Sequence, residues 1–379
     1  MSSLVERLQT LIGHNSISST QAEYDQSNLP VIHTLAQWFA DLGFNVEVHP
    51  IPNFPGKANL LATLGSGTGG LVLSGHTDTV PCDSALWQSD PFTLTERDNK
   101  FYGLGSCDMK GFFALVLEAV KDLRAEDLKQ PIIVLATADE ESSMCGARAL
   151  GQSQALQARY CVVGEPTNLR PIRMHKGIMM ESIRLTGRSG HSSNPALGIN
   201  AMDAMHSVMS ELMLLRQDLA SRYQNAHFAV STPTMNFGCI HGGDNPNRIC
   251  GSCELAFDLR TLPGMSNDDL RSEIDRRIRP IAEREQVLLE YQSLFPGIAS
   301  FATEATSELV KAAEQLTGCT SEAVNYATEA PFFHDLGIET LILGPGSIDQ
   351  AHQPDEYLAH DQIQPCIDIL QGLIKRFCL

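Results

Sequence analysis

The stretch LVLSGHTDTVP, from Leu71 to Pro81, decides the fold class because it changes from apolar to polar within a few residues. Its first half has the composition of a buried strand, and its second half brings His76 and Asp78 to the strand end. Side chains at positions i and i+2 of a strand point to the same face, so these two can contact the same object. A metal ion is one such object. The alternative is an ordinary turn in which the two side chains satisfy local backbone groups.

Two more short apolar runs, PIIVLATA and YCVVGE, follow this strand along the chain, and a helical run, GFFALVLEAVKDL, precedes them. This alternation predicts parallel strands joined by crossover helices. Acidic residues follow the runs, with Glu140 and Glu141 after the first and Glu165 at the end of the second. Ligands of open α/β sheets bind at the carboxyl ends of the strands, so we expect these acids to lie near His76.

A different pattern occupies the middle of the chain, from about residue 175 to residue 292. Its order of strands and helices reads β-α-β-β-α-β, which is typical of a compact α+β unit. Because 379 residues exceed what one core usually holds, two domains are expected. We therefore predict an α/β catalytic domain, residues 1–174 and 293–379, with a central mostly parallel sheet flanked by helices. The predicted inserted α+β domain spans residues 175–292.

The ends and the helices of the chain carry two further patterns. Ser3 and Glu6 fit a capping box before leucines at helical spacing, which predicts an N-terminal helix of the mature fold rather than a leader. In the first inserted helix four methionines recur every three or four residues and predict a packing stripe rather than a cofactor site. These methionines are Met202, Met205, Met209 and Met213.

The composition excludes several classes of partner. A formal net charge of −18 argues against nucleic acid and anionic membranes as general partners, and no apolar run approaches the roughly 18 residues of a membrane span. Of the ten cysteines, only Cys250 and Cys253 are close in sequence, and on a strand they face opposite sides. Buried free thiols are expected, which fits a reducing cytoplasm.

Candidate metal ligands occur in five places along the chain. Each has an ordinary structural explanation when it is taken alone, such as a helix cap or a solvated turn. Together, with several of them at predicted strand ends, they indicate a common site. They are His76, Asp108 in GLGSCDMKG, Glu140 and Glu141 in ADEESS, Glu165 in GEPT, and His352 in AHQPDEY.

Several of these motifs stand in the order of a known family. SGHTDTVP, GLGSCDMKG, DEE, GEPT, GRSGHSS and GPGSIDQAHQPDEY resemble motifs of the cytosolic dizinc metallopeptidases, a family that includes acetylornithine deacetylase, succinyl-diaminopimelate desuccinylase, aminoacylases and carboxypeptidases. The resemblance extends over essentially the whole chain. It implies hydrolysis of an N-acyl amino acid, and the last motif with HKGI favours removal of the acetyl group from Nα-acetyl-L-ornithine in arginine biosynthesis. Residue chemistry alone supports only hydrolysis of a polar amide.

Two classes of alternative remain open at this point. A deacylase of another N-acyl amino acid, or a dipeptidase, shares every catalytic residue with the favoured activity. A non-catalytic binding protein of the same fold is the other class, but such a protein is expected to lack a ligand or the base, and neither is missing here.

The resemblance implies two zinc ions per subunit, with cobalt as a substitute. A carboxylate can hold two ions roughly 3.5–4 Å apart through its two oxygens, and mixed histidine and carboxylate ligands suit either metal. The implied ligands are His76 and Glu165 for one ion, Glu141 and His352 for the other, and Asp108 for both. The resemblance also implies a cis peptide bond after Asp108.

Further residues receive catalytic roles by the same resemblance. Asp78 orients the imidazole of His76, and Glu140 is the general acid/base. His191 in GRSGHSSNP stabilises the oxyanion in the active site of the neighbouring subunit, which implies a homodimer formed through the inserted domain. For the substrate, Arg248 in NPNRI is expected to bind the carboxylate, and the adjacent Asn247 is a further expected substrate contact. Glu329 in YATEAPFF is expected to contact the distal ammonium, unless it is only a surface carboxylate.

Overall fold

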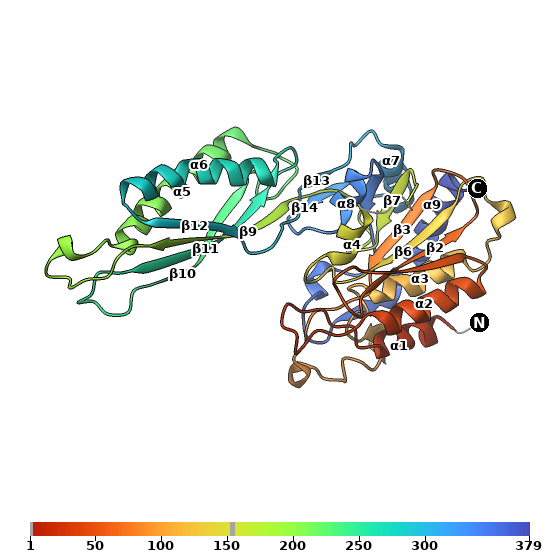
Figure 1. Cartoon of the computed structure of the whole chain (residues 1–379). Helices are drawn as coiled ribbons and strands as arrows, with labels where there is room; N and C mark the ends of the chain where they lie inside the picture. Colours follow the sequence, from red (N-terminus) through yellow and green to blue (C-terminus); the bar gives the residue numbers. More distant parts are fainter. Residues whose placement is uncertain (1–2, 152–155) are drawn as a thin grey trace. The chain divides into compact units, whose positions relative to one another are not determined.

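The computed structural model describes residues 3–151 and 156–379, which form two compact units (Figure 1). Unit 1 consists of Met1–Arg173, Thr303–Glu322 and Thr328–Leu379. Unit 2 consists of Met174–Ala302 and Ala323–Ala327. The interval 175–292, expected for the inserted domain, lies within unit 2, which also includes Met174, residues 293–302 and Ala323–Ala327.

A nine-stranded sheet has the order β1-β2-β6-β3-β7-β15-β8-β13, with β14 paired to β8. Its four central strands, β6, β3, β7 and β15, are parallel, and the outer pairings with known register are antiparallel. This confirms the predicted α/β class and assigns the parallel pairing to the centre of the sheet. The strands are β1 Asn45–Pro50, β2 Ala58–Leu64, β3 Leu71–His76, β6 Ile132–Thr137, β7 Tyr160–Val163, β8 Ile172–His175, β13 Phe301–Ala302, β14 Glu322–Val324 and β15 Glu339–Ile342.

The central strands are buried on both faces, which is why they read as short continuous apolar runs rather than as alternating ones. Every residue of β3, β6 and β7 is buried. These are the three strands that the sequence predicted from LVLSGH, PIIVLATA and YCVVGE.

Five helices share one hydrophobic core with one face of this sheet. Figure 1 shows α1, α2 and α3 on the same side of the sheet. The first of them begins with the predicted capping box of Ser3 and Glu6. The helices are α1 Leu4–Gly13, α2 Leu29–Asp41, α3 Lys110–Val120, α7 Glu308–Thr317 and α9 Ile363–Phe377.

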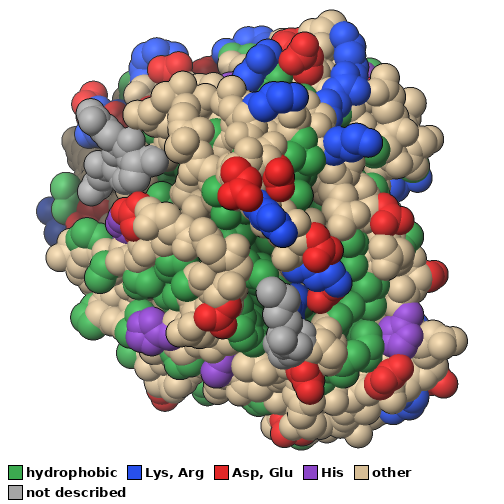
Figure 2. All heavy atoms as spheres, turned by 90° about the vertical axis from the view of Figure 1, so that its right-hand side faces the viewer, with side chains coloured by type: hydrophobic (Ala, Val, Ile, Leu, Met, Phe, Trp, Pro, Cys, Tyr) green, Lys and Arg blue, Asp and Glu red, His purple; other side chains and the backbone are tan. Residues whose placement is uncertain are grey.

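The surface carries both signs of charge. Figure 2 shows acidic and basic side chains interspersed among apolar ones over the face that it presents, rather than a continuous basic area. Among the residues that the structure describes, no helix has the length and apolarity needed to cross a membrane.

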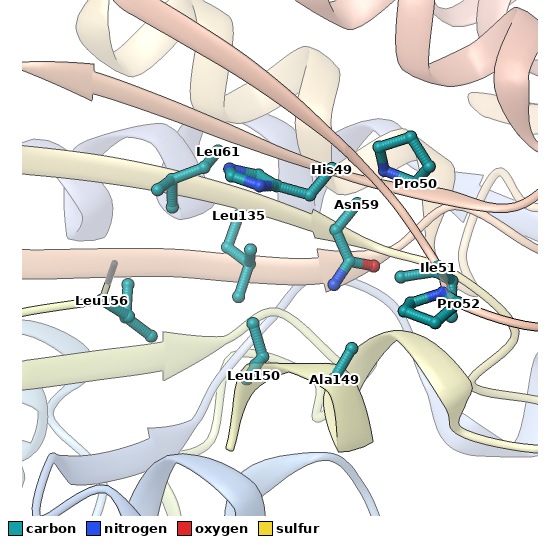
Figure 3. Close-up of a pocket in the computed structure, with 10 residues that line it drawn as sticks. All are labelled: His49, Pro50, Ile51, Pro52, Asn59, Leu61, Leu135, Ala149, Leu150 and Leu156. Carbon is teal, nitrogen blue, oxygen red and sulfur yellow. The ribbon is translucent and has the colours of Figure 1, made fainter. Parts of the chain in front are cut away.

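The other face of the sheet packs against α4 (Cys145–Leu150). Leu61 of β2 and Leu135 of β6 point to this side, and together with Leu150 they line a cavity of about 270 Å³ (Figure 3). Helix α8 (Ala330–Asp335) lies next to α4 and β15. Helices therefore flank both faces of the sheet, as predicted.

A small three-stranded sheet, of order β16-β5-β4, supports two of the loops that carry candidate ligands. The loop with Asp108 leaves β5, and the loop with His352 leads into β16. These strands are β4 Thr95–Arg97, β5 Lys100–Tyr102 and β16 Tyr357–Ala359.

Unit 2 has an antiparallel sheet of order β10-β11-β9-β12, and Figure 1 shows α5 and α6 on one side of it. The order of elements along the chain is the predicted β-α-β-β-α-β. The side chains between the sheet and the helices form the core of this unit. The elements are β9 Gly177–Thr186, α5 Ala201–Arg222, β10 Thr234–Gly242, β11 Ser252–Thr261, α6 Asn267–Arg284 and β12 Leu288–Ser293.

Two predictions about unit 2 need correction. The methionine stripe is wrong for Met202 and Met213, which are 45% and 43% exposed, because the packed face of α5 runs through Met205 and not through them. Cys250 and Cys253 do not face opposite sides of a strand. Both are buried in the same core, because Cys250 precedes β11 and does not follow its alternation.

Candidate metal centre

Candidate ligands gather where the central parallel strands end. His76 is the last residue of β3, Glu140 and Glu141 follow β6, and Glu165 follows β7. His352 lies in the loop after β15. Because neighbouring parallel strands end at the same edge, four separate segments deliver side chains to one place.

These side chains form three overlapping groups. Within each group, the ligand atoms all lie within 4.8 Å of one another. Nε2 of His76 is 3.0 Å from Oδ1 of Asp108 and 3.8 Å from Glu165. The other oxygen of Asp108 is 3.6 Å from Nε2 of His352. Asp108 thus presents one oxygen to each histidine. The groups are His76, Asp108 and Glu165; Asp108, Glu141 and His352; and His76, Glu140 and Glu141.

The orientation of His76 follows from its other ring nitrogen. Nδ1 is 3.1 Å from the backbone carbonyl of Asp78, which can only accept, so Nδ1 donates a hydrogen bond and Nε2 keeps its lone pair for a metal. The carboxylate of Asp78 is further away, at 3.6 Å. Asp78 therefore contacts this ring mainly through its main chain.

The carboxylate of Asp78 is fully buried and accepts three hydrogen bonds. Its donors are the backbone amides of Glu140 and Glu141 and the hydroxyl of Ser18, at 3.1, 3.0 and 2.6 Å. Burial opposes ionisation, but the hydrogen bonds and the neighbouring His76 lower the pKa of Asp78 below its usual value. Sequence reasoning missed Ser18, because a serine in a loop carries no pattern.

The electrostatics of the cluster test whether a cation fits there. Burial, and then the charge of Glu165, raises the pKa of Glu140 well above its usual range. Burial, and then the charge of Asp108, does the same to Glu165. For His76, burial lowers the pKa, but the carboxylates around it outweigh burial and raise the pKa well above normal. These shifts indicate an excess of negative charge that divalent cations would relieve, and the oxygen and imidazole donors suit such ions.

Close backbone contact brings Glu165 into the cluster. A Cβ atom on Gly344 would lie 2.1 Å from the carbonyl oxygen of Gly164, so only glycine allows the segments after β7 and β15 to approach this closely. The next chain segment continues toward His352. Asp108 lies in the loop before α3, and its bond to Met109 is cis, as the family resemblance implied.

The turn that begins at Asp139 has a second support, which sequence reasoning also missed. Asp139 is buried and its carboxylate lies 2.7 Å from Nζ of Lys57, which also binds Asp25. Burial raises the pKa of Asp139 to about 6. Asp139 is the first acid of the motif ADEESS, but nothing in the sequence identifies Lys57 as its partner.

Glu356 is a further buried acid that sequence reasoning missed. It is 1% exposed and lies four residues after His352. Its carboxylate accepts hydrogen bonds from the backbone amides of Gly105, Cys107 and Asp108. Its neighbour Asp355 is an acid as well, so the sequence offers no sign of which of the two is buried.

Three of the predicted residues lie together in unit 2. His191 and Arg248 form an isolated antiparallel bridge, and the carbonyl of Asn247 accepts a hydrogen bond from the amide of Ser192. The guanidinium of Arg248 pairs with Asp244, and both side chains are more than half exposed. Motifs about 50 residues apart along the chain, GRSGHSS and NPNRI, thus form one local structure.

Glu329 lies in unit 1 and is not the surface carboxylate of the alternative explanation. It is 0% exposed, and one of its oxygens accepts a hydrogen bond of 2.9 Å from Thr137 at the end of β6. The other oxygen has no hydrogen-bond partner among the described residues. Burial raises the pKa of Glu329 to about 7. A contact with substrate therefore requires that neighbouring side chains move.

The fold and the site define an α/β protein with a candidate dinuclear metal centre at the carboxyl ends of parallel strands. The chain belongs to peptidase family M20/M25/M40, whose family model matches residues 72–376. It is 50% identical over 376 residues to the acetylornithine deacetylase of Edwardsiella ictaluri (strain 93-146), covering 99% of this chain and 98% of the relative. It is 50% identical over 373 residues to that of Aliivibrio salmonicida (strain LFI1238), covering 98% of each.

Solved structures share the fold at low sequence identity. An aminopeptidase PepT from Bacillus cereus ATCC 10987 is similar with a TM-score of 0.78 and 18% identity, over 98% of this chain and 97% of that one. The Bacillus subtilis YXEP protein, described as a dinuclear metal binding peptidase of family M20, has a TM-score of 0.68 and 15% identity, over 98% and 96%.

Proposed function

We propose that this protein is a metal-dependent amidohydrolase that converts Nα-acetyl-L-ornithine and water into L-ornithine and acetate. The observation that carries the proposal is the position of Asp108, whose two oxygens lie 3.0 Å and 3.6 Å from the histidines of two separate ligand groups. Relatives at 50% identity over nearly the whole chain are named acetylornithine deacetylase, which supports the substrate. Formation of ornithine gives the reaction its place in arginine biosynthesis.

Two zinc ions are the proposed cofactors, and cobalt is a substitute with the same ligand preferences. His76 and Glu165 would hold one ion, Glu141 and His352 the other, and Asp108 both. When bound, such a pair polarises the substrate carbonyl and makes water a nucleophile at neutral pH. The related YXEP protein is described as dinuclear, which supports two sites.

Glu140 is the proposed general acid/base. It accepts a proton as the oxygen of water attacks the acetyl carbonyl carbon, and it gives a proton to the amine nitrogen as the carbon–nitrogen bond breaks. Its amide is held by Asp78, whereas its carboxylate belongs to the ligand group of His76 and Glu141.

His191 is the proposed donor to the oxyanion of the tetrahedral intermediate in the partner subunit. The backbone amide of Ser193 lies 3.2 Å from Nδ1 of His191, and an amide can only donate, so Nδ1 accepts. A neutral ring in this state carries its hydrogen on Nε2. The exposed Nε2–H is then free to donate to developing negative charge.

Substrate contacts are proposed for both ends of acetylornithine. Arg248, with Asn247 beside it, is the proposed partner of the α-carboxylate, since a guanidinium can bind a carboxylate through two parallel hydrogen bonds. Glu329 is the proposed partner of the distal ammonium. Its unpaired oxygen supports this role, because a buried acceptor without a donor gains from a cation.

A homodimer formed through unit 2 completes the proposal. Strand β10 is an edge strand, and edge strands with exposed apolar side chains tend to pair with another chain. Ile240 on this strand is 51% exposed, and the exposed Met202 of α5 lies close to Gly243 just beyond its end. A second copy would cover these side chains. All ten cysteines are free thiols, which supports a cytoplasmic location.

A substrate panel on metal-loaded protein tests the proposed function. Acetylornithine, acetylcitrulline, acetylmethionine and succinyl-diaminopimelate are compared by kcat/KM, with Glu140→Gln as the control for contaminating activity. We expect acetylornithine to give the highest value. A preference for another acyl amino acid would assign the same site to that substrate. Unchanged activity in the Glu140→Gln variant would show that this site does not catalyse the reaction. Absence of hydrolysis with bound metal would favour a binding protein.

A further inference from the structure

Glu356 connects two segments that carry metal ligands, although it belongs to none of the ligand groups. It lies four residues after His352, and its carboxylate reaches the loop between β5 and α3. One oxygen accepts hydrogen bonds from the amides of Cys107 and Asp108, at 2.8 and 2.9 Å. The other accepts one from Gly105, at 3.1 Å. The main-chain carbonyl of Glu356 also accepts from Gly103.

The loop from Gly103 to Met109 needs these bonds because it lies between a strand and a helix and has no ladder partner for its amides. Buried amides are normally paired, and here one buried carboxylate serves three of them. The bond to the amide of Asp108 matters most, because it restrains the backbone from which the shared ligand projects. One side chain that accepts three backbone amides restrains the path of the loop, because each of these buried amides would otherwise lack a partner.

Tight packing beneath the loop leaves it little freedom to adopt another path. Gly105 has a φ of +83°, and a Cβ atom there would lie 2.5 Å from Cε of Lys110. Lys110 is itself buried, and its ammonium donates to the carbonyl of His14. Packing against Lys110 and hydrogen bonds to Glu356 therefore both restrain the loop.

The same residue also restrains the segment of His352. Strand β16 starts directly after Glu356 and pairs with β5, which directly precedes the Asp108 loop. The distance from Nε2 of His352 to Oδ2 of Asp108 is 3.6 Å, so the two ligands meet only if both loops keep their paths. Glu356 makes its hydrogen bonds between the two loops.

We propose that Glu356 is a positioning residue for the metal centre: its carboxylate sets the direction of Asp108 and its distance from His352. This inference rests on the proposed function, because it concerns the same centre. It assigns Glu356 no contact with metal or substrate.

The test compares Glu356→Gln with a matched variant, Glu181→Gln. Glutamine has one acceptor oxygen, so it cannot accept from the amides on both sides of the carboxylate, whereas its volume is unchanged. Glu181 is an equally buried glutamate that pairs with Arg271 in unit 2 and so controls for the loss of any buried carboxylate. Dissociation constants for Zn²⁺ are measured by equilibrium dialysis, and the visible absorption of the Co²⁺-loaded protein reports ligand geometry.

We expect Glu356→Gln to weaken metal binding about 10- to 100-fold, as loss of a supporting partner of a metal ligand does elsewhere, and to change the Co²⁺ spectrum. Glu181→Gln should leave both unchanged even if it lowers the unfolding temperature. Unchanged metal affinity and spectrum in folded Glu356→Gln would overturn the proposal. If that variant does not fold, Glu356→Asp decides: an altered spectrum supports the proposal and a wild-type spectrum overturns it.

The proposed function and the positioning role of Glu356 can be refuted independently. Metal affinity and the Co²⁺ spectrum are read without any substrate, so wild-type protein that binds metal but does not hydrolyse acetylornithine leaves the positioning role to be judged by these two measurements. Wild-type protein that binds no divalent ion would overturn both.

Discussion

The backbone amide of Glu141 donates a hydrogen bond of 3.0 Å to the buried carboxylate of Asp78. The adjacent amide of Glu140 donates to the other oxygen of the same carboxylate. Asp78 follows β3 and the two glutamates follow β6, so one side chain connects the ends of two neighbouring strands. The proposed base and a proposed ligand are therefore oriented by the same group.

Substitution of Asp78 by asparagine should disturb both glutamates at once. An amide side chain has one acceptor, so at least one of the two backbone hydrogen bonds is lost. We expect a loss of about 10- to 100-fold in metal affinity or in kcat. The measurement is kcat together with metal stoichiometry, and the control is Asp41→Asn at the exposed end of α2. Wild-type values in both would show that these hydrogen bonds do not position the site.

Glu140→Gln and Asp108→Ala should fail in different ways. The first removes the proposed base but no proposed ligand, so turnover should fall roughly 10²-fold or more while metal is retained. The second removes the ligand shared by both ions and should abolish activity with loss of metal. Elemental analysis and kcat separate the two. Full metal retention in Asp108→Ala would argue against a shared ligand.

A mixture of two inactive variants should regain activity if His191 acts across the dimer. In a heterodimer of His191→Ala and Glu140→Ala chains, one active site contains both an intact His191 and an intact Glu140. Part of the wild-type activity is then expected after subunit exchange. The assay is acetylornithine hydrolysis before and after mixing, with exchange followed by mass spectrometry. Proven exchange without recovery would place His191 in its own chain's site or outside catalysis.

Glu329→Gln and Arg248→Ala should differ in their substrate dependence. Acetylornithine has a distal ammonium and acetylmethionine does not, whereas both have the α-carboxylate. Glu329→Gln is therefore expected to reduce kcat/KM for acetylornithine much more than for acetylmethionine. Arg248→Ala should reduce both. Equal losses on the two substrates in the Glu329 variant would assign the ammonium to another residue.

The buried His175 should make stability depend on pH. Burial lowers its pKa from 6.5 to about 4, so between these values the unfolded chain binds more protons than the folded one. Stability is therefore lost as pH falls through this window, by about 2 kcal/mol between pH 7 and pH 5. Urea unfolding at both values should show this loss in wild-type protein, and a loss smaller by that amount in His175→Gln. Identical pH dependence in the two proteins would contradict the assignment.

Much of the site was predictable because the carboxyl ends of parallel strands lie together at one edge of a sheet. His76, Glu141 and Glu165 follow apolar runs, and the carboxyl ends of parallel strands share one edge, so their proximity follows from the order of the elements. Asp108 and His352 lie in loops that have no periodicity, so their residue types made them candidates and only the resemblance to a family assigned them to particular metal ions. The structure brings all five together, and their roles as ligands remain proposals.

The sequence by itself determined the α/β class, the central strands and the inserted unit, because apolar periodicity reflects local geometry that each segment carries alone. It also determined the family. Only the tertiary structure decided which polar atoms face one another: that Glu356 rather than Asp355 is buried, that Asp78 holds Glu140 and Glu141, and that Lys57 meets Asp139. The physical reason is separation along the chain. The amide of Asp108 and the carboxylate of Glu356 are 248 residues apart, and no local pattern specifies a hydrogen bond that exists only once the sheet has brought their loops together.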